Sequence, residues 1–147
     1  MLSTKTFYQG AFKCSDSCNT QEIGLVMGGY NNTVTCFSPD KGTDPNLKAR
    51  FYFPDAEKVV SVKEYWKKQG ITVYGVLRDR FGESEELTEN DKKFLTEVMD
   101  ALGDEINCFY YPCIMKGQGK IIGHKAVLTE GGIRFESDEI KIVELKF

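Results

Sequence analysis

The sequence predicts an α+β fold, in which two main helices pack on a mixed β-sheet to form a sandwich. Three observations lead to this prediction: strand-like segments open the chain, two capped helical patterns flank one strand in its middle, and further strands close it. The chain has 147 residues, 41% of them hydrophobic, and no repeat or low-complexity linker divides it. We therefore expect a single domain spanning residues 1–147, with its own hydrophobic core.

Four strands are predicted before the first helix, at residues 6–12, 23–27, 32–37 and 49–53. Gly28-Gly29 and Asn31-Asn32 predict the turn between the second and third of them, because glycine and asparagine are common in tight turns. Residues 38–46 contain two prolines and several turn-forming residues, so they predict a surface loop.

Two helices are predicted from their caps and from the spacing of their apolar residues. The first begins at Pro54-Asp55, with Asp55 as its N-cap, and ends near Gln69, just before Gly70. The second begins near Thr88 and ends before Gly103. Their apolar stripes are Val59, Val62 and Trp66 on the first helix, and Phe94, Leu95, Val98, Met99 and Leu102 on the second.

Strands make up the rest of the prediction. A β-branched strand at 71–77 lies between the helices and is followed by a polar loop at 78–87. Four more strands are predicted at 107–115, 120–128, 133–136 and 140–147. The last of them alternates apolar residues with lysine and glutamate, which is typical of a sheet edge.

Composition narrows the class of function. Nineteen lysines and arginines against 22 acidic residues give a net charge of −3, which disfavours a nucleic-acid binder. No segment approaches the ~20 apolar residues of a membrane span, and the first residues lack the apolar core of a signal peptide. The five cysteines, without an export signal, favour reduced thiols. We therefore expect a cytoplasmic protein whose partner is neither nucleic acid nor a membrane.

The chain contains one histidine, His124, so it cannot supply a site with two histidine ligands by itself. Two alternatives use cysteines. Cys14, Cys18, Cys108 and Cys113 offer four thiolates for a structural zinc ion, although their spacings differ from the tight Cys-x₂-Cys pair. Cys108 or Cys113 with His124 offers the pair of a cysteine hydrolase, although no glycine-rich turn flanks either thiol. Reduced thiols without a catalytic or metal-binding role are the favoured interpretation.

The segment from Gly75 to Asp91 carries the most informative spacing. Arg78 and Arg80 lie two residues apart at the end of a strand, so their side chains point the same way. Asp91 follows Arg78 by thirteen residues, one turn into the next helix, and can return to meet both arginines. With histidines at 78 and 80, this arrangement would bind zinc and leave one position open for water.

This spacing resembles the JAMM motif of the JAB/MPN metallopeptidase-like family, which is His-x-His-Pro followed by Ser-x-x-Asp. The motif positions are occupied here by Gly75, Arg78, Arg80, Phe81, Thr88 and Asp91. Glu22, before the glycine-rich apolar residues 23–29, is similar to the glutamate on the family's early strand. The resemblance covers roughly residues 5–145 and implies a JAB/MPN-like, cytidine-deaminase-like architecture.

The departures from the motif bear directly on chemistry. Both histidine positions hold arginine, and a guanidinium has no lone pair for a metal ion. Asp91 alone cannot hold zinc, and Glu22, the family's general base, then lacks a metal-bound water. The resemblance therefore implies a catalytically inactive domain without metal or cofactor, in which Glu22, Thr88 and Asp91 are degenerate catalytic positions.

The resemblance also implies a partner. Active members hydrolyse peptide or isopeptide bonds at ubiquitin-like tails, so we expect a protein or peptide, with a ubiquitin-like tail as one candidate. Arg78, Arg80, Asp91 and Glu22 would line the cleft that binds it, with the peptide extended along a sheet edge. The alternative is a hydrolase of the JAMM type whose site is unusual or is completed by another chain. A domain of unrelated fold that binds a small ligand is the third class.

Each of these residues also has a simpler interpretation. Thr88 and Asp91 fit a helix capping box. Arg78 and Arg80 fit surface ion pairs, or a site for a carboxylate or phosphate. Glu22 fits a solvated charge at the end of a strand.

Overall fold

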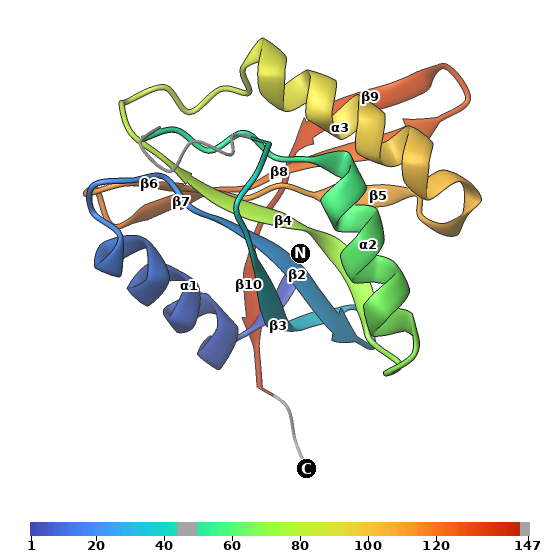
Figure 1. Ribbon diagram of the computed structural model, residues 1–147, viewed down its shortest axis with the longest axis horizontal. Coiled ribbons are helices and arrows are strands. Elements are labelled where there is room, and N and C mark those ends of the chain that lie inside the picture. The colour runs from blue at the N-terminus through green and yellow to red at the C-terminus, as the bar shows by residue number, and fades with distance from the viewer. Residues whose placement is uncertain (44–49, 145–147) are drawn as a thin grey trace.

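The computed structural model describes residues 1–43 and 50–144, in which a curled mixed sheet is flanked by helices on both faces (Figure 1). The helices are α1 (Lys5–Ser17), α2 (Ala56–Lys67), α3 (Glu89–Leu102) and the short 3₁₀ helix η1 (Gly103–Glu105). The strands are β1 (Leu2–Thr4), β2 (Gly24–Tyr30), β3 (Thr33–Asp40), β4 (Thr72–Arg80), β5 (Cys108–Tyr110), β6 (Cys113–Met115), β7 (Lys120–Ile122), β8 (His124–Thr129), β9 (Gly132–Ser137) and β10 (Lys141–Val143). Over the described residues, no helix is long and apolar enough to cross a bilayer.

Strand β4 lies at the centre of the sheet, whose main path runs β10-β1-β3-β2-β4-β5-β8-β9. It pairs antiparallel with β2 on one side and parallel with β5 and then β6 on the other. Arg78 at its end therefore lies between Gly24 of β2 and Cys113 of β6. The mixture of parallel and antiparallel pairs confirms the predicted α+β class.

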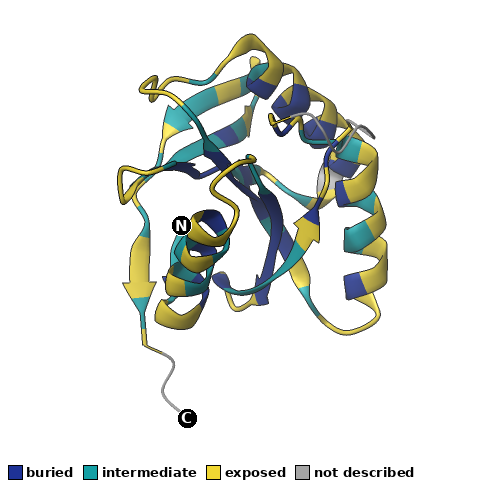
Figure 2. Cartoon of the chain, turned by 60° about the vertical axis from the view of Figure 1, so that its left-hand side comes forward, coloured by how far each residue is buried: buried dark blue, intermediate teal, exposed yellow. Residues whose placement is uncertain are grey.

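The two faces of the sheet support separate hydrophobic cores. Along β2, Val26 faces α2 and α3, whereas Leu25 and Met27 face α1, because successive side chains of a strand point to opposite faces. Phe7 of α1 packs in the core with Leu25 and Met27, and Leu95 of α3 packs in the core with Val26; all five side chains are buried. Figure 2 shows buried positions, in dark blue, along the strands that lie between the helices. Helix α1 thus covers one face while α2 and α3 cover the other.

Helices α2 and α3 confirm the two predicted helices and their caps. The side chain of Asp55 accepts a hydrogen bond from the N–H of Glu57, and that of Thr88 from the N–H of Asp91. Gly70, with a φ of +74°, follows α2 in a conformation that favours glycine. These local signals were sufficient to predict where the two helices begin and end, because each signal acts within one turn of the helix end.

The predicted strand at 6–12 is wrong, because those residues belong to α1. Thr4 caps this helix by accepting a hydrogen bond from the N–H of Phe7 at 3.2 Å. Phe7, Ala11 and Ser15 are buried at intervals of four residues, which is the spacing of a helix face. The aromatic residues of this segment favour strands intrinsically, but packing of this face on the sheet outweighs that preference.

Other boundaries also moved. Residues 50–53 form no strand, and residue 49 lies outside the described part of the chain. Strand β3 extends to Asp40, so only residues 41–43 of the described part of the predicted loop at 38–46 lie outside a strand, and residues 44–46 are outside the description. Asn31 and Asn32, with φ of 55° and 59°, form the β2–β3 turn alone, while Gly28 and Gly29 belong to β2.

Two of the last four predicted strands are divided in two, while β9 is one residue longer at each end than the predicted 133–136. Segment 107–115 divides at Tyr111-Pro112 into β5 and β6, and segment 120–128 divides at Gly123 into β7 and β8. A Cβ atom at Gly123 would lie 1.9 Å from the carbonyl oxygen of Asp138, so this crossing requires glycine. Strand β10 lies at the end of the strand order, which confirms the predicted edge, and residues 145–147 are outside the description.

Candidate functional site

The end of strand β4 directs three consecutive charged side chains to two faces of the sheet. Arg78, Asp79 and Arg80 all belong to the strand, although the sequence predicted that a loop begins at 78. The N–H of Arg78 donates to the carbonyl of Pro112, which continues the sheet on that side. Arg78 and Arg80 therefore point toward α3, whereas Asp79 points toward α1.

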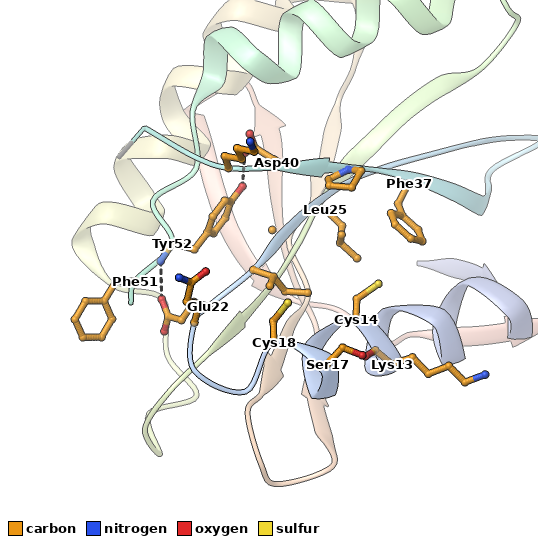
Figure 3. Close-up of a pocket in the computed structure, with 15 residues that line it drawn as sticks. Lys13, Cys14, Ser17, Cys18, Glu22, Leu25, Phe37, Asp40, Phe51 and Tyr52 are labelled. Atoms are coloured by element: carbon orange, nitrogen blue, oxygen red, sulfur yellow. Dashed lines mark hydrogen bonds between the residues drawn. The ribbon is translucent and has the colours of Figure 1, made fainter. Parts of the chain in front are cut away.

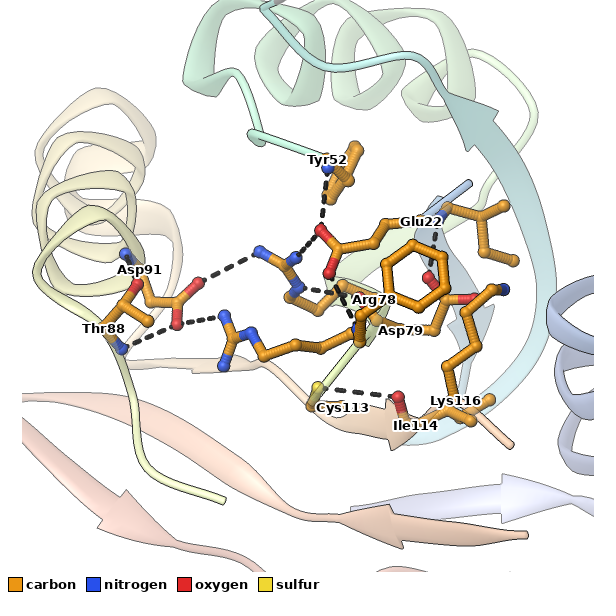
Figure 4. Close-up of polar contacts among 12 residues, drawn as sticks. Glu22, Tyr52, Arg78, Asp79, Thr88, Asp91, Cys113, Ile114 and Lys116 are labelled. Atoms are coloured by element: carbon orange, nitrogen blue, oxygen red, sulfur yellow. Dashed lines mark hydrogen bonds and ion pairs between the residues drawn. The ribbon is translucent and has the colours of Figure 1, made fainter. Parts of the chain in front are cut away.

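The guanidinium of Arg78 lies between two buried carboxylates (Figure 4). Its Nη2 is 2.8 Å from Oε1 of Glu22 and its Nη1 is 3.3 Å from Oδ1 of Asp91. Its Nε donates to the carbonyl of Asp79 at 3.1 Å. Arg78 is only 4% exposed, so neither it nor Glu22 is a solvated surface charge. We call Glu22, Arg78, Arg80, Asp91 and Tyr111 the Arg78 cluster.

The carboxylate of Glu22 is fully engaged by its own chain. Besides Arg78, Oε1 accepts a hydrogen bond from the N–H of Tyr52 at 2.9 Å. Oε2 accepts one from the N–H of Phe81, also at 2.9 Å. Glu22 thus fixes the residues before α2 and the first residue after β4 to the end of the sheet.

Asp91 holds the other side of the cluster. Its Oδ1 accepts from the hydroxyl of Tyr111 at 2.6 Å, and its Oδ2 pairs with Nη2 of Arg80 at 2.5 Å. Oδ2 also accepts from the N–H of Thr88, while the N–H of Asp91 donates to Oγ1 of Thr88, which completes the predicted capping box. One aspartate therefore both caps α3 and binds two arginines.

The surroundings of Asp91 and Arg78 stabilise the charged forms of these two side chains. Burial by itself raises the pKa of Asp91, but the Tyr111 hydroxyl, the Thr88 N–H and the two arginines outweigh it, so the pKa of Asp91 falls below its usual value. Burial likewise lowers the pKa of Arg78, but Tyr111, Asp91 and Glu22 outweigh it, so the pKa of Arg78 rises. Arg78 and Asp91 are therefore both charged at neutral pH.

The four residues predicted to share a site, Glu22, Arg78, Arg80 and Asp91, do come together. Sequence reasoning missed Tyr111, whose hydroxyl is bonded to Asp91 and which is completely buried. No motif marks this tyrosine, because it lies in an apolar segment twenty residues beyond its partner. The convergence disfavours the third class considered above, a small-ligand domain of unrelated fold.

The residues present do not fit the zinc ion that the intact JAMM motif would bind. The guanidinium groups of Arg78 and Arg80 offer no lone pair, and the carboxylates of Glu22 and Asp91 already accept hydrogen bonds from donors of this chain. Within residues 1–43 and 50–144, no three His, Cys, Asp or Glu side chains gather in a way that could hold a metal ion. This also leaves the four-cysteine zinc alternative without support.

The cysteine hydrolase alternative has no support in the geometry either. Nε2 of His124 contacts the carbonyl of Glu85 at 3.0 Å. The thiol of Cys113 lies 3.8 Å from the carbonyl of Ile114, and burial raises the pKa of this thiol to about 11. A neutral thiol that lacks a histidine partner is a weak nucleophile.

A cleft of about 260 Å³ opens beside the Arg78 cluster. Its walls combine aromatic side chains with the polar edge of the cluster and the start of α3. It is lined by Glu22, Phe51, Tyr52, Phe53, Pro54, Arg78, Arg80, Phe81, Thr88 and Asn90.

On the opposite face of the sheet, Asp79 is the centre of a second buried cluster that the sequence did not predict. Its Oδ2 accepts from the hydroxyl of Ser15 and pairs with Nζ of Lys116, both at 2.6 Å. Its Oδ1 accepts from the N–H of Ile23, also at 2.6 Å. We call Ser15, Ile23, Asp79 and Lys116 the Asp79 cluster, of which Figure 4 labels Asp79 and Lys116.

The curled mixed sheet and its three helices define the fold as that of JAB/MPN domains, and the predicted JAB/MPN-like architecture is confirmed. AF2198, a JAB1/MPN domain protein of Archaeoglobus fulgidus, matches 98% of this chain over 100% of its own, with a TM-score of 0.56 and 12% identity.

Two further solved structures share this fold. Protein DSY2949 of Desulfitobacterium hafniense matches 99% of this chain over 94% of its own, with a TM-score of 0.65 and 14% identity. A protein of Salinibacter ruber matches 98% over 92%, with a TM-score of 0.55 and 12% identity. Comparison of the sequence with protein-family models and with curated proteins finds no match. At these identities the likeness establishes the fold alone.

Proposed function

We propose that this chain is a catalytically inactive JAB/MPN-like domain that binds a protein or an extended peptide in the cleft beside the Arg78 cluster. One observation carries the proposal: the guanidinium of Arg78 bridges the carboxylates of Glu22 and Asp91. The two acidic groups that the resemblance assigns to catalysis thus serve as internal partners of a fixed cation. A guanidinium stays protonated at any physiological pH, so this arrangement is permanent.

The cleft walls support binding. Phe51 and Phe53 are 56% and 38% exposed, although both are large apolar residues. Phe81, beneath the guanidinium carbon of Arg50 at 4.8 Å, adds a third aromatic ring. Exposed aromatic side chains around a hollow are the usual anchors of protein–protein contacts. A ubiquitin-like tail remains the first candidate partner, because it is extended and enters such a cleft without its own fold.

The choice of variant decides whether a binding test is informative. Replacing Arg78 and Arg80 together would disturb the buried cluster, so lost binding would not be distinguishable from lost folding. Phe51 and Phe53 line the cleft and lie outside the Arg78 cluster, so Phe51→Ser with Phe53→Ser changes the cleft wall and leaves the buried cluster intact. Tyr65→Ser is the matched control, since Tyr65 is 67% exposed on α2 and does not line the cleft.

The first experiment selects binders from a displayed random-peptide library on the immobilised full chain, with titration of intact ubiquitin as a second arm. We expect peptides that bind the wild type and the Tyr65→Ser variant but not the double phenylalanine variant. Enrichment that is equal on all three proteins, or no enrichment at all, would contradict the proposed cleft.

The second experiment addresses the alternative of a JAMM-type hydrolase completed in an unusual way. Purified chain is analysed for zinc and assayed for cleavage of ubiquitin-linked substrates. We expect zinc well below one equivalent and no cleavage. Stoichiometric zinc, together with cleavage that Asp91→Asn abolishes, would establish the hydrolase and overturn the proposal.

A further inference from the structure

A second and larger pocket, of about 470 Å³, lies between α1 and the strands β2 and β3 (Figure 3). It adjoins the cleft through a shared wall of Glu22, Phe51 and Tyr52 but opens over a different part of the sheet. We propose that this pocket binds a small amphipathic carboxylate, with its apolar chain inside and its carboxylate at the rim. This inference stands apart from peptide binding in the cleft.

The pocket exists because the side chains of α1 that face the sheet are large at the start of the helix and small at its end. In the first turns Phe7 fills the space, and its ring packs on that of Phe37 at 6.1 Å. At the end of the helix and its C-cap, three of the four residues that line the pocket are small, namely Cys14, Ser17 and Cys18, and the fourth is the exposed Lys13. The helix therefore leaves a hollow above β2 and β3 in its last turn.

The floor of this hollow is apolar. Leu25, which is 3% exposed, lies on β2, and Phe37 and Pro39 line it from β3. Ile23 adds to this apolar lining. A volume of about 470 Å³ lies within the usual range of small-molecule sites, about 300–1,000 Å³. An aliphatic chain is the group that such a lining favours.

The charges around the pocket favour an anion. Glu22 is paired with Arg78, and Asp40 accepts hydrogen bonds from the hydroxyl of Tyr52 at 2.5 Å and from the N–H of Gly42 at 3.2 Å. In contrast, Lys13 and Lys41 line the same pocket, and both are exposed.

Among the described residues of the lining, these two lysines are the only charged side chains without a polar partner. Because Asp40 on the same wall pairs with no cation of the described residues, a monoanionic carboxylate fits better than a doubly charged phosphate.

Two half-buried thiols, Cys14 in the pocket wall and Cys36 outside the pocket, offer a way to detect a ligand. Burial, and to a smaller extent the neighbouring Cys18, raises the pKa of Cys14, so its thiol is neutral at pH 7. Cys14 is half-buried in the pocket wall. Cys36, also half-buried, packs with the core on the other face of the sheet. A ligand in the pocket shields the first thiol and leaves the second unchanged.

The test uses decanoate as the probe and decanol as its neutral match, with the intact chain. Alkylation by iodoacetamide is followed at each cysteine by peptide mass spectrometry. We expect decanoate to slow alkylation of Cys14 and leave that of Cys36 unchanged, and decanol to protect Cys14 less well. Unchanged alkylation of Cys14 with decanoate overturns the proposal, and equal protection by decanol overturns the role of the carboxylate.

Three variants, checked for folding by circular dichroism, test the assignment by calorimetric titration. Lys13→Gln and Lys41→Gln should each weaken decanoate binding by about two- to fivefold, as expected for exposed ion pairs, without affecting decanol. Ser17→Trp should abolish binding of both ligands, because its side chain faces the pocket and its bulk fills it. Asp16→Trp is the matched control on the same helix, outside the lining. Full binding by Ser17→Trp would place the ligand elsewhere and overturn the proposal.

Discussion

The Arg78 cluster and the Asp79 cluster grow from adjacent residues of one strand, yet they place their charges differently. On one face a single guanidinium lies between the carboxylates of Glu22 and Asp91. On the other face a single carboxylate, Asp79, is bound by the ammonium of Lys116, a hydroxyl and an N–H. Removing Arg78 therefore takes away the cation of Glu22 and one of the two cations of Asp91, whereas removing Lys116 takes away the cation of a single carboxylate, Asp79. The position of the cation within a buried network, rather than the number of ion pairs, determines how much the fold depends on it.

The largest effect is expected for Arg78→Met. It keeps most of the apolar volume of the side chain but leaves Glu22 and Asp91 buried with one fewer cation, so the free energy of unfolding should fall by about 3–5 kcal/mol. Urea unfolding followed by circular dichroism measures this loss. Arg80→Met is the comparison, because it removes only one partner of Asp91 and should cost less. Equal losses in the two variants would show that Arg78 has no special position.

A smaller loss is expected for Lys116→Met. Asp79 stays buried, but the hydroxyl of Ser15 and the N–H of Ile23 still donate to it, so the free energy of unfolding should fall by about 2–3 kcal/mol. Lys120→Met is a matched control, because its ion pair with Glu85 is about half exposed and should contribute less than about 1 kcal/mol. If Lys116→Met costs as much as Arg78→Met, the comparison between the clusters fails.

Acid should reduce the stability that Asp91 of the Arg78 cluster contributes, which distinguishes this buried carboxylate from exposed ones. Because the pKa of Asp91 is lower in the folded chain, the unfolded chain takes up this proton first as the pH falls. The stabilisation by Asp91 is thus complete above its unfolded pKa of about 4 and is lost as the pH drops toward its folded pKa.

The difference in unfolding free energy between wild type and Asp91→Asn should therefore shrink on acidification. Denaturant titrations at several pH values measure it. Glu89→Gln, whose side chain is 95% exposed at the start of the same helix, serves as the control. A wild-type minus Asp91→Asn difference that stays constant down to low pH would contradict the paired state of Asp91.

The smallest effect concerns the cap of α3. Thr88→Ala removes the oxygen that accepts from the N–H of Asp91 and should lower the free energy of unfolding by about 1 kcal/mol. Thr96→Ala changes the same residue type within the helix, where its hydroxyl bonds to the carbonyl of Lys92. Alanine is favoured there, so Thr96→Ala should be neutral or slightly stabilising in thermal unfolding. A loss at 96 equal to that at 88 would argue against the cap.

The fold was predictable where its signals are local. Asp55 and Thr88 begin their helices as predicted, because a cap acts on residues two or three positions away. Helix α1 was not predicted, because Phe7 and its aromatic neighbours favour a strand until they have a sheet to pack on. The division of the later strands at Gly123 likewise depends on the approach of Asp138, which no local pattern indicates.

The sequence predicted which charged residues of the candidate site come together, but it did not predict that they are buried. The spacing of Arg78 and Asp91 was sufficient to bring those residues together, since one strand and one helix start determine it. The burial of the Arg78 guanidinium could not be predicted, because it depends on Tyr52 and Tyr111, which lie far from Arg78 in the sequence. Nor could the sequence reveal that Asp79 of β4 binds α1, because its partners Ser15 and Lys116 are far from it and from each other in the sequence.

The parallel pairing of β1 with β10 has a consequence for how the molecule assembles. Strand β1 pairs with β3 through contacts such as that of Leu2 with Thr33, which are available early in synthesis. Its other edge pairs with β10, with Leu2 opposite Lys141, almost the full length of the chain away. Closing so long a loop is slow, so we expect this edge to stay open on the ribosome until the last strand emerges. Until β10 is available, β1 therefore presents an unpaired strand edge, and the pairing of β10 completes its protection.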